Sequence, residues 1–102
     1  MNTINRELVE EMLSELGFGE CELSRVPEWL GDMTNVERVF IEGFGSLVCK
    51  RHVAVLFYHC GVQIVTHYES WGCDGNLEVS RVERSDVHDE LDLLRKRKHY
   101  WA

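Results

Sequence analysis

The sequence predicts an α+β fold with an N-terminal helix, an antiparallel sheet of four or five strands and a C-terminal helix. Apolar residues recur at helical spacing at both ends of the chain, whereas β-branched and aromatic residues separated by glycines fill its middle. With 102 residues and 44% hydrophobic side chains, the chain has the usual size of one domain with its own core. We therefore expect a single α+β domain over residues 1–102.

The first helix is expected over residues 4–16. Its apolar stripe consists of Ile4, Leu8, Val9, Met12, Leu13 and Leu16. Thr3 can cap the first turn, and Gly17 can take the left-handed conformation that ends the helix. Residues 19–35 have no sustained period, but Pro27 favours one short helical turn that holds Trp29 against the core.

Strands are expected over residues 36–42, 46–50, 52–58, 62–68 and 77–82, with turns at 43–45, 60–61 and 70–76. No turn residue marks the break between the second and third of these strands. The alternative is one long bent strand over residues 46–58.

The central hairpin determines which side chains share a face. With Cys60 and Gly61 as its turn residues, Phe57 faces Ile64 and Ala54 faces His67. Strand alternation then predicts a core face made of Val53, Val55, Phe57, Val62, Ile64 and Tyr68. The second face carries His52, Ala54, Leu56, Tyr58, Gln63, Val65 and His67.

Three apolar or aromatic residues of the second face, Leu56, Tyr58 and Val65, are candidates for partner binding. They are exposed unless a helix or the linker around Trp29 covers them, and exposed apolar patches mark partner surfaces. An open face of this kind also makes a homodimer a possible assembly. The covered and the uncovered arrangements are both compatible with the sequence.

The C-terminal helix is expected to begin at Ser85, with acidic residues in its first half and basic residues in its last half, which suits the helix dipole. The order of helix, strands and helix resembles the double-stranded-RNA-binding domain in outline. That family has basic residues at the start of its second helix, where this chain has Asp86, Asp89 and Glu90. The resemblance therefore does not extend to RNA binding.

The acidic charge is concentrated near the N-terminus. The formal net charge is −7, and residues 1–42 hold ten carboxylates and three arginines. A domain with this balance is repelled by phosphate backbones, so we expect no direct contact with nucleic acid. Because the chain has no apolar run of ~20 residues and no cationic leader, we also expect no membrane segment and a location in the cytoplasm, that of the host cell if the protein is phage-encoded.

Metal-binding residue types gather between residues 49 and 67, at Cys49, His52, His59, Cys60 and His67. Zinc needs four converging ligands, whereas neighbours on a strand point to opposite faces. We expect no metal site and no cofactor, and we keep a small zinc-binding or regulatory module as an alternative.

The remaining thiol of interest is Cys73, in the glycine-flanked loop WGCDG. Cys73 with His67 as a base is the alternative in which the protein is an enzyme. The chain has no phosphate-binding loop, nucleophile elbow or H-E-x-x-H motif, so we expect no catalytic residues.

The function expected from these observations is protein binding through an acidic surface. The expected binding carboxylates are Glu7, Glu10, Glu11, Glu15, Glu20 and Glu22. The first four lie on the expected helix, where their spacing is similar to that of neighbouring phosphates, so such a face can occupy a basic groove made for nucleic acid. The profile resembles that of phage or mobile-element inhibitors such as anti-CRISPR proteins. Toxin-neutralising immunity proteins share this profile, and no motif separates the two.

Overall fold

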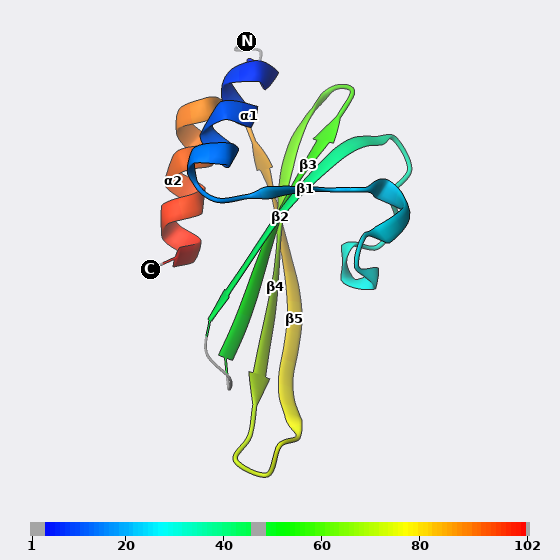
Figure 1. Ribbon diagram of the computed structural model, residues 1–102, viewed down its shortest axis with the longest axis vertical. Helices are drawn as coiled ribbons and strands as arrows, with labels where there is room; N and C mark the ends of the chain where they lie inside the picture. The colour runs from blue at the N-terminus through cyan, green and yellow to red at the C-terminus, as the bar shows by residue number, and fades with distance from the viewer. Residues whose placement is uncertain (1–3, 46–48, 102) are drawn as a thin grey trace.

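The computed structural model describes residues 4–45 and 49–101 and has the predicted α+β fold. Five antiparallel strands follow one another in the order β1-β2-β3-β4-β5, and a helix lies at each end of the chain (Figure 1). The elements are α1 (Arg6–Glu15), β1 (Gly19–Cys21), β2 (Val36–Gly45), β3 (Cys49–Tyr58), β4 (Gly61–Trp71), β5 (Leu77–Val87) and α2 (Glu90–Trp101).

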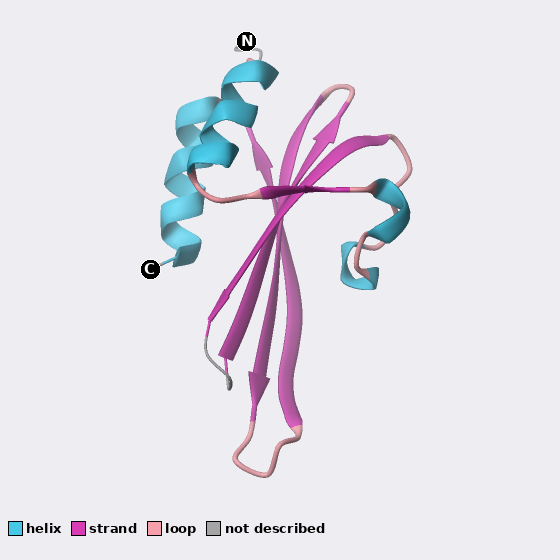
Figure 2. Ribbon diagram, viewed as in Figure 1, coloured by secondary structure: helices cyan, strands magenta, loops and turns pink. Residues whose placement is uncertain are grey.

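The two helices cover one side of the sheet, and the linker between β1 and β2 covers the other. α1 and α2 lie side by side and run in the same direction, while the short 3-10 helices Leu23–Arg25 and Glu28–Leu30 lie across the sheet from them (Figure 2). The molecule is elongated, at 49 × 28 × 21 Å, and its long hairpins extend past the helices at one end. Neither helix in the described part of the chain has the length and apolar character needed to cross a membrane.

The core beneath the helices matches the face predicted from strand alternation. Val9 and Leu13 of α1 and Leu93 of α2 pack onto the sheet in this core. The sheet residues they contact include Phe40, Val53, Val55, Phe57, Val62 and Ile64, with Tyr68 partly buried at the margin. The buried stripe of α1 and the apolar face of the sheet therefore form one layer.

The linker forms a second core on the opposite face. Leu30 packs there with Val36, Val39, Ala54, Leu56 and Val65, and Trp29, Met33 and Tyr58 are partly buried around them. Leu56 and Val65 are fully buried. The possibility that they form an exposed partner surface is therefore wrong, because the linker covers them.

The ends of α1 differ slightly from expectation. Asn5 is the N-cap, and its Oδ1 accepts a hydrogen bond from the backbone N–H of Leu8 at 3.2 Å. The expected cap, Thr3, lies outside the described residues. Gly17 has a φ of 90°, which confirms its predicted left-handed role, and the N–H of Phe18 returns to the carbonyl of Leu13 at 2.9 Å.

The central hairpin turns one residue earlier than predicted. Tyr58 pairs with Gly61, so Phe57 faces Val62 and Ala54 faces Val65. The expected pairs with Ile64 and His67 are wrong because the turn residues are His59 and Cys60. The shift moves each partner by two positions, and the two faces therefore keep their predicted members.

The predicted break inside residues 46–58 is absent from the described part, because β3 runs unbroken from Cys49 to Tyr58. Residues 46–48 lie outside the described residues. The short strand β1, in the segment expected to be irregular, pairs with β2 from Gly19 opposite Ile41 to Cys21 opposite Val39. Three residues are too few to produce a detectable alternation.

The fifth strand is longer than predicted, and α2 begins later. β5 continues to Val87, and Ser85 pairs with Ile64 instead of capping a helix. The hydrogen bonds of this longer hairpin outweigh the capping preference of a serine. The cap is Asp89, whose Oδ1 accepts a hydrogen bond from the N–H of Asp92 at 2.6 Å.

Candidate functional site

Three carboxylates form a stripe along the exposed side of α1. Glu7, Glu11 and Glu15 are four residues apart, so each is about 6 Å further along the helix axis than the last. All three are exposed, and none forms an ion pair with any described residue. Leu8, on the same side of the helix, is 43% exposed. We call Glu7, Glu11 and Glu15 the α1 acidic stripe.

The other predicted carboxylates are paired with the chain's own arginines. Arg38 of β2 binds Glu10, and its Nε and Nη2 each lie 2.8 Å from an oxygen of Glu20. These hydrogen bonds hold the pKa of Glu20 below its ordinary value. Glu22 lies 3.6 Å from Arg25. The acidic surface is therefore narrower than the sequence indicates.

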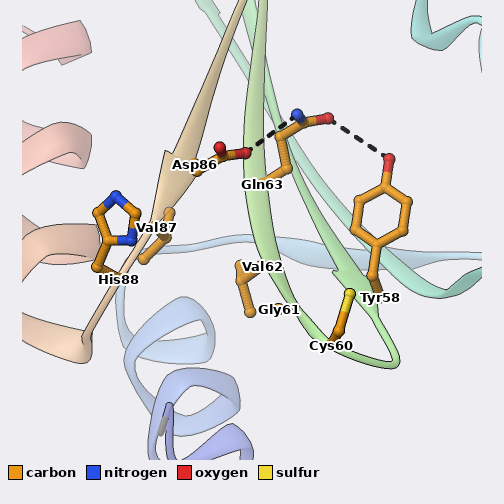
Figure 3. A pocket seen from close by; sticks show the side chains of 8 residues that line it. All are labelled: Tyr58, Cys60, Gly61, Val62, Gln63, Asp86, Val87 and His88. Carbon is orange, nitrogen blue, oxygen red and sulfur yellow. Dashed lines mark hydrogen bonds between the residues drawn. The ribbon is translucent and has the colours of Figure 1, made fainter. Parts of the chain in front are cut away.

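Of the three partner-binding candidates on the second face, Leu56, Tyr58 and Val65, only Tyr58 is partly exposed. It lines a pocket of about 320 Å³ at the β3–β4 turn, together with Cys60, Gly61, Val62, Gln63, Asp86, Val87 and His88 (Figure 3). The Tyr58 hydroxyl donates to Oε1 of Gln63, and Nε2 of Gln63 donates to Oδ1 of Asp86, both at 3.4 Å.

The first turn of α1 is attached beside this pocket. Arg6 donates a hydrogen bond to the carbonyl of Tyr58 and lies 2.5 Å from Glu37. Cys60 and His88 lie at opposite ends of the pocket, so they do not form a thiol–imidazole pair (Figure 3). The pocket thus offers a tyrosine, an amide and a carboxylate from the linker face of the sheet, and the first turn of α1 reaches it through Arg6.

A second group of polar residues lies on the linker face of the sheet, beyond the second core. His52 of β3 and His67 of β4 are direct cross-strand partners with ring centroids 6.3 Å apart. Glu69 is two residues beyond His67 on the same face, and its Oε1 is 3.3 Å from Nδ1 of His67. We call His52, His67 and Glu69 the histidine cluster. Trp29 stacks on His67 with ring centroids 5.0 Å apart.

Only two of the five predicted metal-ligating residues come together. Cys49 is three residues from His52 on the same strand and therefore points to the other face, with its Sγ 4.0 Å from Oγ of Ser70. His59 and Cys60 form the turn at the far end of β3. Glu69 was missed although its spacing of two from His67 could have identified it. The arrangement in which the linker around Trp29 covers this face was left open, but no sequence signal pairs Trp29 with His67.

Cys73 and His67, the pair considered for the enzyme alternative, form no contact with each other in the described structure. Cys73 is exposed in the loop between β4 and β5, and no hydrogen bond joins it to His67 in the described part of the chain. The partners of His67 are Trp29, Ser80 and Glu69. This structure therefore gives no support to a thiol nucleophile with His67 as its base.

Comparison with known proteins adds no family to this description. The chain matches no protein-family model, no curated protein and no solved structure.

Proposed function

We propose that the protein acts by binding another protein through the α1 acidic stripe, and that it inhibits a basic protein that handles nucleic acid. The proposal rests on three exposed carboxylates, Glu7, Glu11 and Glu15, none of which forms an ion pair in the described structure. Carboxylates with arginine partners have already lost much of their attraction for an external cation. The three carboxylates of the stripe keep this attraction, and they would steer a basic partner towards α1.

The surroundings of the stripe fit a protein partner better than a small ion. Leu8 adds exposed apolar surface beside the carboxylates, and interfaces combine a buried apolar centre with a charged rim. The pocket at Tyr58 offers Asp86 on the linker face of the sheet as a separate acidic contact, suited to a lysine or arginine side chain of the partner. Arg6 holds the pocket rim and α1 together through the carbonyl of Tyr58.

A phage or mobile-element inhibitor of the anti-CRISPR kind, acting in the host cytoplasm, would use a surface of this type. An immunity protein against a basic toxin would use the same contacts. The two differ in the partner that is captured, a defence protein or a toxin. Neither requires catalysis by this chain.

The test is a charge reversal with a matched control. Glu11→Lys/Glu15→Lys reverses the last two-thirds of the stripe, where cations also suit the helix dipole, so α1 should remain folded. Glu28→Lys/Glu78→Lys makes the same change in net charge at exposed carboxylates that have no ion pair in the described structure. Each protein is immobilised and used to capture purified basic nucleic-acid-binding proteins at low and moderate salt.

We expect the stripe variant to lose roughly tenfold or more in affinity for the captured partner, while the control retains most of it. The affinity of the wild-type protein should also fall with rising salt. If both variants lose the same affinity, the interaction is a general attraction between net charges and not binding at the stripe. Unchanged affinity in the stripe variant would remove α1 from the interface.

A further inference from the structure

Two buried nitrogens in the histidine cluster have no hydrogen-bond partner. They are Nδ1 of His52 and Nδ1 of His67, and neither forms a hydrogen bond within the described structure. Oε1 of Glu69 is 3.3 Å from Nδ1 of His67, but the angle between them is not that of a hydrogen bond. Buried polar atoms nearly always have a partner, and a bound ion can serve those that find none within the protein.

The contact between His67 and Ser80 occupies one of the two imidazole nitrogens, Nε2. Nε2 of His67 is 3.2 Å from Oγ of Ser80 on the neighbouring strand β5. When Nε2 carries the proton and donates it to this hydroxyl, Nδ1 presents its lone pair. Metal-binding histidines characteristically use their second nitrogen in this way.

The position of His52 depends on a glycine. A Cβ on Gly43 of β2 would lie 2.7 Å from Cδ2 and 3.0 Å from Nε2 of His52, so the imidazole fills the space that a side chain would occupy. Because this edge of the ring lies against β2, the opposite edge, which carries Nδ1, is turned towards β4. Nδ1 of His52 is therefore on the edge of the ring away from β2, and His67 is the direct cross-strand partner on the β4 side.

The separations are close to those around a tetrahedral ion. One ligand atom from each residue of the histidine cluster lies within 4.8 Å of the others. Bonds of about 2.0–2.2 Å to zinc place tetrahedral ligands about 3.3–3.5 Å apart. The separation of 3.3 Å between Nδ1 of His67 and Oε1 of Glu69 already satisfies this. Binding of an ion would require the His52 ring and the Glu69 carboxylate to rotate inward from separations of up to 4.8 Å.

The cluster is shielded but not closed. His67 is 7% exposed and lies under Trp29, whereas the Glu69 side chain is 21% exposed. An ion can therefore enter past Glu69, and the apolar indole would limit competition from water on the other side.

We propose that His52, His67 and Glu69 bind a divalent transition-metal ion, with zinc as the best match to two imidazoles and one carboxylate. The three residues supply three ligands, and a water molecule completes the tetrahedron. The bound ion would link β3 and β4 beneath Trp29 and so stiffen the linker over the second core. This inference does not depend on the acidic stripe or its partner.

The test measures zinc binding to the whole protein by calorimetry after dialysis against a chelator. We expect one zinc ion per chain and a higher unfolding temperature in the presence of zinc. Glu69→Gln should weaken binding by roughly tenfold, and His52→Ala by roughly a hundredfold. His59→Ala, which removes a 95% exposed imidazole at the far turn, should leave binding unchanged.

A second control separates the cluster from the exposed thiols. Cys49→Ser/Cys60→Ser/Cys73→Ser should retain full affinity, and bound Co²⁺ should show a tetrahedral spectrum without a thiolate charge-transfer band. Absence of stoichiometric binding by the folded wild-type protein would overturn the proposal. Loss of zinc binding in the cysteine variant would also overturn the proposal. Zinc binding at full affinity in Glu69→Gln and His52→Ala would overturn it as well. If His52→Ala fails to fold, the zinc affinity of Glu69→Gln tests the proposal. The Glu69 side chain is partly exposed, so this substitution should leave the fold intact.

Discussion

Arg97 of α2 forms an ion pair with Glu42 of β2 between the helices and the sheet. The Arg97 side chain is 1% exposed, and its guanidinium lies 5.0 Å from the centre of the Phe18 ring. Burial lowers the pKa of Arg97, and the Glu42 carboxylate opposes this shift. The pair therefore ties α2 to β2 by a charged contact that is removed from water.

Removing Glu42 should therefore be more damaging than an ordinary surface substitution. Glu42→Ala leaves a buried guanidinium without its carboxylate, and we expect it to lower the free energy of unfolding by about 3 kcal/mol or more. Glu42→Leu/Arg97→Met replaces both charges by apolar side chains and should restore most of the loss. Urea unfolding of the three proteins measures both effects. A Glu42→Ala variant as stable as wild type would mean that the pair contributes nothing.

The close contact between Gly43 and His52 gives a second prediction. Gly43→Ala forces the imidazole to move, and we expect it to reduce the free energy of unfolding by about 1–3 kcal/mol. Gly19→Ala is the control, because a Cβ there meets nothing within 4 Å. In a His52→Ala background the Gly43→Ala substitution should cost much less, since the clashing ring is gone. Equal costs in the two backgrounds would show that the two residues are not coupled.

The linker core gives a third prediction. Leu30 is fully buried against the second face of the sheet, whereas Leu23, earlier in the same linker, is 45% exposed. We expect Leu30→Ala to cost about 2–5 kcal/mol of unfolding free energy and Leu23→Ala under about 1 kcal/mol. Thermal or urea unfolding distinguishes them. Similar small losses in both variants would mean that the linker does not form part of the cooperative core.

The fold was predictable because each of its main elements has a strong local pattern. The stripe through Val9 and Leu13 and the alternation around Val55 and Phe57 are periodic signals that tertiary contacts reinforce. The exact start of α2 was not predictable, because Ser85 is both a good cap and a residue that pairs in β5.

The sites were only partly predictable, for two physical reasons. Arg38 neutralises Glu10 and Glu20 across 28 and 18 residues of sequence, and no local pattern reveals such a contact. The pairing of His52 with His67 depends on the turn of the central hairpin, where a difference of one residue moves every partner by two. The sequence places both histidines on one face of the sheet, but it does not show that they are direct cross-strand partners.

The arginine pairs give the last prediction, which concerns acid stability. Hydrogen bonds from Arg38 and Arg6 lower the pKa values of Glu20 and Glu37 from their ordinary value of 4.5. A carboxyl whose pKa is lower in the folded state stabilises the protein fully above about pH 4.5, and this contribution is lost as the pH falls through the folded value. The free energy of unfolding should therefore fall below pH 4.5, and fall less steeply in Glu20→Gln/Glu37→Gln. Removing the cations with Arg6→Gln/Arg38→Gln should flatten the curve in the same way. Unfolding titrations between neutral and acid pH measure the slopes, and unchanged slopes in both double variants would contradict the assignment.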